Sequence, residues 1–134
     1  MNLGINKKTK EKVGIKIIKK PTLETNKDIE LVKSEIDIMS IIKHKNIIKL
    51  IDTFENEEYI FIVMEYMKGG NLTSYLKKKH FCISERKTKE IIKQIAEGIS
   101  YLHNYGIIHR DIKSDNILLS DNSDNFNIKI TVLA

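Results

Sequence analysis

The chain has 134 residues, 41% hydrophobic and 31% charged, a composition typical of one globular domain and unlike that of a disordered or fibrous protein. Its formal net charge is +5, and all but two of its 23 basic residues are lysines spread over many segments. Readers of nucleic acid usually combine arginine with stacking aromatic rings. We therefore expect solvated lysine faces and no nucleic-acid partner.

No apolar run approaches the length that crosses a bilayer, and the start of the chain lacks the apolar stretch of a secretory signal. The single cysteine, Cys82, cannot form an internal disulfide. We therefore expect a cytoplasmic protein without a membrane partner.

The first half of the chain alternates between strand and helix patterns. Alternating apolar residues predict two strands at 1–6 and 11–19, joined in a hairpin. Apolar positions at helical spacing predict a helix over 27–43. A second hairpin is expected from β-rich runs at 46–54 and 59–66.

The second half begins at the Gly69-Gly70 break. Asn71 is placed to cap a short helix through Lys79, and Ser84 to cap a long helix that Gly106 ends. Short strands are expected at 117–119 and 127–131. The apolar stripe expected on the long helix consists of Ile91, Ile92, Ile95, Ile99 and Leu102.

Two charged residues in the first half occupy apolar settings. Lys16 stands in the hydrophobic strand VGIKII, where strand periodicity would place an apolar side chain. All four neighbours of Glu35 on the same face of the helix, three and four residues to either side, are apolar. They are Leu31, Val32, Ile38 and Met39. A carboxylate in an apolar stripe is costly without a cation, so we expect Lys16 to partner Glu35. The alternative is a glutamate at the helix edge that reaches water.

These residues and two longer motifs resemble the eukaryotic protein kinases. VGIK at 13–16 resembles their VAIK strand, Glu35 the glutamate of helix C, MEYMKGG at 64–70 the hinge, and HRDIKSDNILL at 109–119 the catalytic loop. Lys113, two residues after Asp111, resembles the serine/threonine type. The hinge and loop are similar to those of the MAP-kinase-cascade and p21-activated kinases or of the calmodulin-dependent kinases.

The resemblance implies roles for the residues of the catalytic loop. Asp111 would orient the substrate hydroxyl and accept its proton, and Lys113 would offset charge on the transferring phosphate. Asn116 would hold a magnesium ion. His109 would be a packing residue, and Arg110 would await a phosphate on an activation loop.

The resemblance also implies an ATP site. Lys16, aligned by Glu35, would bind the α- and β-phosphates. The residues expected against the nucleotide are Met64 as gatekeeper, Glu65, Met67, Asn71 and Leu118. Gly14 stands where the family has alanine above the adenine.

The implied fold is α+β and protein-kinase-like. We expect a small lobe at 1–64 with an antiparallel sheet and helix C but without its first strand. A hinge at 65–70 and the start of a helical large lobe at 71–134 would follow. By the family's spacing the glycine-rich loop would precede Met1, and Val132 stands where the magnesium-binding aspartate of the DFG motif is expected. Ile91, Ile95 and Leu102 would then lack packing partners.

The sequence is compatible with three functions. The first is part of an ATP- and magnesium-dependent serine/threonine kinase with protein substrates, a fragment inactive by itself. The second is a non-catalytic pseudokinase that binds a partner protein such as a related kinase. A basic binding module, for nucleic acid or another partner, ranks last because the lysines are dispersed.

Overall fold

A computed structural model describes residues 2–20, 26–107 and 112–131 of the chain. Contacts divide the chain into two compact units. The first unit is Met1–Ile42 with Lys49–Tyr66, and the second unit is Lys43–Ile48 with Met67–Ala134. The boundaries predicted from the family resemblance, a small lobe at 1–64, a hinge at 65–70 and the start of a large lobe at 71–134, stay predictions.

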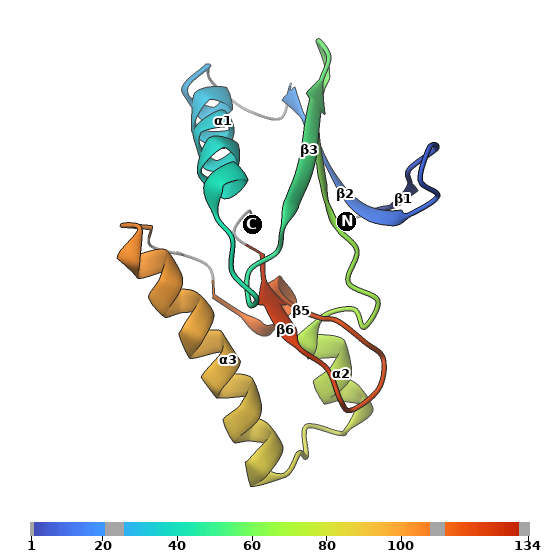
Figure 1. The fold of residues 1–134 in the computed structure, drawn as a ribbon, viewed down its shortest axis with the longest axis vertical. Coiled ribbons are helices and arrows are strands. Elements are labelled where there is room, and N and C mark those ends of the chain that lie inside the picture. Colours follow the sequence, from blue (N-terminus) through green and yellow to red (C-terminus); the bar gives the residue numbers. More distant parts are fainter. Residues whose placement is uncertain (1, 21–25, 108–111, 132–134) are drawn as a thin grey trace. The chain divides into compact units, whose positions relative to one another are not determined.

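The first unit is built on a four-stranded antiparallel sheet with strand order β1-β2-β4-β3 (Figure 1). Its strands are β1 (Asn2–Ile5), β2 (Lys12–Lys19), β3 (Leu50–Glu55) and β4 (Tyr59–Glu65). Along β4 every second residue is buried, as expected for a strand with one face in the core. Both predicted hairpins are confirmed.

The third strand begins four residues later than predicted. Residues 46–48 belong to the second unit, where the Ile48 amide donates to the Ile130 carbonyl at 3.0 Å and the Ile130 amide donates to the Asn46 carbonyl at 2.8 Å. The β-rich pattern of residues 46–48 therefore reflects burial in the second unit, and not membership of the sheet.

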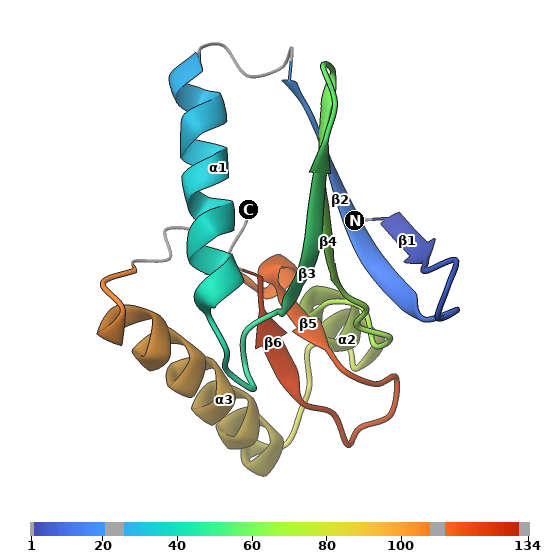
Figure 2. The same ribbon diagram turned by 45° about the horizontal axis from the view of Figure 1, so that its top comes forward.

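Helix α1 (Asn26–Ile41) completes the first unit and packs on β3 (Figure 2). Its most buried side chains are Ile36 and Met39, while Leu31 and Ile41 are exposed. The helix thus has more apolar positions than the sheet covers. Only the stripe that contains Ile36 and Met39 faces the core.

The second unit contains α2 (Leu72–Lys78), α3 (Glu85–Asn104), the short 3-10 helix η2 (Ser114–Asn116), β5 (Ile117–Leu119) and β6 (Ile128–Ile130). The predicted caps are confirmed: Asn71 Oδ1 accepts from the Ser74 amide at 2.9 Å, and Ser84 Oγ accepts from the Lys87 amide at 3.1 Å. Gly106 follows α3 with a φ of 73°. This left-handed conformation suits glycine after a helix end.

The core of the second unit lies where β5 and β6 meet α2 and α3. Its buried members are Leu72, Ile91, Ile117, Leu119, Phe126 and Ile128. Leu102 is also fully buried. The expectation that Ile91, Ile95 and Leu102 lack packing partners is therefore wrong, because Ile91 belongs to this core, Ile95 packs against it and Leu102 is buried. Ile92, expected in the buried stripe of α3, is 59% exposed, so that expectation is wrong as well.

Among the described residues, no helix combines the length and the apolar character needed to cross a membrane.

Candidate functional site

Lys16 lies on the buried face of the sheet in the first unit. It pairs directly with Ile62 of β4, which is fully buried, and Gly14 pairs with the buried Met64. Directly opposed residues of antiparallel strands point to the same face. Lys16 therefore shares a face with two core side chains, as its place in the alternating pattern predicted.

Two opposing effects act on the pKa of the Lys16 ammonium group. Burial is the larger effect and lowers the pKa, because the charged form loses hydration. The Glu35 carboxylate raises it, and the net pKa lies below the ordinary value of 10.5. The electrostatic influence of Glu35 means that β2 and α1 bring these two residues near each other.

The side chain of Glu35 is exposed, as the alternative of a glutamate at the helix edge that reaches water predicted. The flanking Leu31 is 62% exposed and Ile38 is 37% exposed, whereas Ile36 and Met39 are buried. Two apolar stripes lie side by side on α1, and Glu35 belongs to the one that faces water. The electrostatic interaction with Lys16 is thus between a half-buried cation and an exposed carboxylate. Because it is exposed, the carboxylate loses little hydration.

Met64 and Glu65 end β4 in the first unit. Met64 is 1% exposed, and its Cα is opposite Gly14 on one side and Leu50 on the other. Glu65 is held by the start of β3, because its amide donates to the Lys49 carbonyl at 3.0 Å and its Oε1 accepts from the Lys49 amide at 2.8 Å. The structure therefore fixes the end of β4 tightly.

The segment 67–71 lies along β5 in the second unit. The Gly69 amide donates to the Leu119 carbonyl at 2.9 Å, and the Leu119 amide donates to the Gly70 carbonyl at 2.8 Å. Asn71 and Leu118 form an isolated antiparallel bridge. The structure therefore places Asn71 and Leu118, both expected against the nucleotide, directly opposite each other. Met67, at the start of the segment, is buried.

Gly69 is required by this close approach. A Cβ at this position would lie 2.8 Å from both the Leu119 Cβ and the Asp121 carbonyl carbon. Both neighbours are fixed parts of β5 and its following loop, so neither can move aside as a flexible side chain would. The first glycine of the pair that the sequence suggested as a break is thus also required by packing.

Lys113 directly precedes η2 and Asn116 is its last residue, also in the second unit. The Asn116 amide donates to the Lys113 carbonyl at 3.0 Å. The Asn116 carbonyl accepts from Thr131 twice, from the amide at 3.0 Å and from Oγ1 at 3.1 Å. The backbone of Asn116 is thus anchored to the residue that follows β6.

His109, Arg110, Asp111 and Val132 lie outside the described residues. Their expected roles, including that of Asp111 with the substrate hydroxyl, stay predictions.

The described residues offer few ligands for a magnesium ion. Among them, no group of three or more His, Cys, Asp or Glu side chains could hold a metal. Magnesium prefers about six oxygen ligands but commonly keeps several waters and uses substrate phosphates. Asn116, with its amide oxygen and fixed backbone, fits as one such ligand. Most of the coordination sphere would have to come from phosphate and water.

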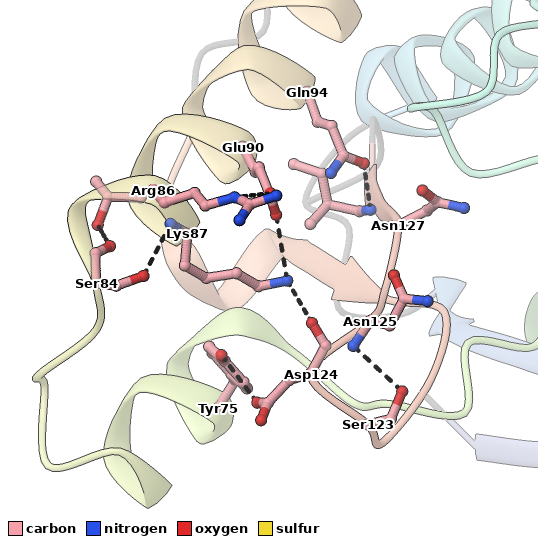
Figure 3. Close-up of polar contacts among 12 residues, drawn as sticks. Tyr75, Ser84, Arg86, Lys87, Glu90, Gln94, Ser123, Asp124, Asn125 and Asn127 are labelled. Atoms are coloured by element: carbon pink, nitrogen blue, oxygen red, sulfur yellow. Dashed lines mark hydrogen bonds and ion pairs between the residues drawn. The ribbon is translucent and has the colours of Figure 1, made fainter.

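A polar cluster ties the loop between β5 and β6 to the two helices of the second unit (Figure 3). The Lys87 ammonium group donates to the Asp124 carbonyl and lies 4.1 Å from the centre of the Phe126 ring. The Asp124 carboxylate accepts from the Tyr75 hydroxyl at 3.2 Å and pairs with Lys79 at 3.1 Å. The hydrogen bond from Lys79 is the main reason that the pKa of Asp124 is lowered. This cluster fixes the hairpin whose first strand directly follows Asn116.

No sequence motif marks these supporting residues. Lys87 and Tyr75 lie 37 and 49 positions before Asp124, and Thr131 lies 15 positions after Asn116. Each is an ordinary polar residue in the sequence, so only the fold pairs them.

Comparison with known proteins finds relatives over most of the chain. A family described as "Protein kinase domain" matches residues 1–132. The chain is 41% identical over 118 residues to NUAK family SNF1-like kinase 1 of Homo sapiens. The aligned region covers 88% of this chain and 17% of that protein. It is 44% identical over 127 residues to calcium-dependent protein kinase 5 of Plasmodium berghei, covering 95% of this chain and 22% of that protein.

A probable myosin light chain kinase of Dictyostelium discoideum is 36% identical over 127 residues, covering 95% of this chain and 36% of that protein. The chain thus spans from about a sixth to about a third of the length of these relatives. The family match extends over both units and includes the strand of Lys16 and the turn of Asn116. The chain belongs to the protein kinase domain family, and its relatives include a serine/threonine-protein kinase of Nematostella vectensis.

Proposed function

We propose that this chain carries nucleotide-binding and phosphoryl-transfer residues of a serine/threonine kinase that uses ATP and magnesium and acts on protein hydroxyl groups. The observation that carries the proposal is the position of Lys16. A lysine on the core face of a sheet is costly to keep, and its lowered pKa reflects that cost. A phosphate ligand would compensate the buried charge.

In the first unit, Lys16 binds the α- and β-phosphates, and Glu35 orients the ammonium group through its field. Met64 and the backbone at Glu65 contact the adenine. The fixed end of β4 supports this assignment, since recognition of a flat base needs a rigid edge.

In the second unit, Met67, Asn71 and Leu118 contribute further nucleotide contacts. The ladder of residues 69–71 along β5 supports this assignment, since it holds Asn71 and Leu118 rigidly opposite each other. Lys113 offsets charge on the transferring phosphate and Asn116 supplies one oxygen ligand to magnesium. Bound magnesium would neutralise phosphate charge and hold the phosphates in line for transfer.

The chemistry asked of the protein is mainly positioning. Asp111 orients the hydroxyl of a serine or threonine in the substrate protein and takes its proton as the oxygen attacks the terminal phosphorus of ATP. The bond between that phosphorus and the bridging oxygen breaks, leaving ADP.

The test begins with ATP binding by the chain, measured by titration calorimetry with magnesium. Lys16→Met should weaken binding by about tenfold or more, because a charge-assisted contact with phosphate is lost. Lys12→Met is the matched control, since Lys12 is an exposed lysine of the same strand. Equal binding by Lys16→Met and wild type would refute the assignment.

Transfer is tested separately with radiolabelled ATP and a mixture of protein substrates, using Asp111→Asn as the catalytic control. Label on serine or threonine that depends on Asp111 would support catalysis. ATP binding without any transfer would favour the non-catalytic, partner-binding alternative.

A further inference from the structure

Thr73 makes a contact that neither the sequence motifs nor the roles proposed above explain. It lies in the first turn of α2, two residues after the Asn71 cap. Its hydroxyl reaches η2, which is 41 positions further along the chain. Both elements belong to the second unit.

The hydroxyl bonds two residues of η2 at once. Thr73 Oγ1 donates to Asp115 Oδ1 at 2.5 Å, and it lies 2.6 Å from Ser114 Oγ. A hydroxyl has one proton to donate, and here the Asp115 carboxylate takes it. The Ser114 hydroxyl must then donate to Thr73. One threonine thus holds two consecutive side chains of the turn through a consistent set of donors and acceptors.

The turn depends on such outside contacts. Lys113 occupies its N-cap position without a side-chain cap hydrogen bond, and a three-residue 3-10 helix has little stability of its own. On one side the Asn116 carbonyl is bound by Thr131. On the other side, Thr73 is the only side chain in the described part of the chain that holds Ser114 and Asp115.

We infer that Thr73 is a positioning residue for the metal ligand, which clamps η2 through Ser114 and Asp115 so that Asn116 is held ready for magnesium bound to a nucleotide. The inference rests on the proposed function, because it is that proposal which gives Asn116 its magnesium. Thr73 itself touches neither the metal nor the phosphates. Its influence passes through the backbone of the turn.

Three variants separate positioning from general stability. Thr73→Val keeps the shape of the side chain and removes the hydroxyl, and Thr73→Ser restores the hydroxyl. Thr88→Val is the matched control, because within the described part of the chain the Thr88 hydroxyl bonds only the Ser84 carbonyl, at 3.0 Å, at the exposed start of α3. None of these residues belongs to the proposed catalytic machinery.

The first readout is hydrogen exchange of backbone amides, followed by NMR on the full 134-residue chain. Thr73→Val should speed exchange of the Asn116 amide about tenfold, as expected for loss of a hydrogen bond to a charged group. Exchange in α3 should stay unchanged. Thr73→Ser should restore the wild-type rate, and Thr88→Val should leave the turn unaffected.

The second readout is the affinity for Mn²⁺ together with ATP, measured by paramagnetic broadening. Thr73→Val should weaken it about three- to tenfold, with rescue by Thr73→Ser. Unchanged exchange at Asn116, faster exchange throughout the chain, or local opening without loss of metal affinity would each overturn the inference. A wild-type chain that binds no Mn²⁺ with ATP would instead refute the proposed function, so the two failures are distinguishable.

Discussion

Replacing Asn46 with alanine probes the link between residues 43–48 and the rest of the second unit. Asn46 is 2% exposed, and its Nδ2 donates to Gln94 Oε1 at 3.2 Å and to the Ile128 carbonyl at 3.0 Å. Gln94 Oε1 also accepts from the Ile128 amide at 2.9 Å. One asparagine therefore joins the loop after α1 to both α3 and β6.

The expected cost follows from these contacts. Each lost hydrogen bond is worth about 1 kcal/mol, and the Ile128 carbonyl loses this side-chain donor at a further cost of about 1 kcal/mol. Asn46 Oδ1 is buried without a partner among the described residues, so its removal returns about 1 kcal/mol. The free energy of unfolding should fall by about 2 kcal/mol.

Urea denaturation followed by circular dichroism measures this change. The slope of the unfolding free energy against urea concentration is compared between variants. Asn122→Ala is the control, because Asn122 is exposed in the loop before β6 and should cost less than about 0.5 kcal/mol. A double-mutant cycle with Gln94→Ala should give a coupling energy of about 0.5–1.5 kcal/mol. A loss below 0.5 kcal/mol for Asn46→Ala, or zero coupling, would refute the proposed network.

Three further outcomes are expected. The pKa of Lys16 is lowered in the folded chain, so the unfolded chain binds the proton more tightly, and Lys16→Met should raise the free energy of unfolding at neutral pH. That advantage should shrink as the pH rises toward 10.5, and an advantage independent of pH in urea titrations would contradict it. Gly69→Ala should destabilise the fold by about 2 kcal/mol through overpacking. Gly70→Ala, with open space but a φ of 72°, should cost about 1 kcal/mol. Thermal melting ranks the two losses of stability, and a larger loss for Gly70→Ala would count against the close packing of Gly69. Ile91→Ala should cost about 2–4 kcal/mol in the same assay, because its side chain is 5% exposed in the core of the second unit, and a loss below 1 kcal/mol would mean that this core is loosely packed.

The order of the elements could be predicted from the sequence because its signals are local. Alternation along residues 59–65 marks a strand with one buried face, and polar residues at Asn71 and Ser84 cap the helices that follow them. The motifs around Lys16 and Lys113–Asn116 indicated the kinase family for the same reason, since each is a short run of neighbouring residues.

Tertiary structure decided which of several apolar surfaces is covered. Two stripes of α1 look alike in the sequence, and packing buries Ile36 while leaving Glu35 exposed. Residues 46–48 resemble strand but join the second unit through Ile130. A local pattern reports that a residue can be buried, but it does not identify the partner.

The support of the candidate site depended entirely on long-range contacts. The hydroxyl of Thr73 meets Ser114 and Asp115 only because α2 and η2 pack together. Lys87 reaches the Asp124 carbonyl in the same way. The sequence by itself determined the elements, the caps and the kinase motifs of this protein. Only the tertiary structure determined which helix face is buried and which polar residues hold the site, because those depend on partners that are distant along the chain.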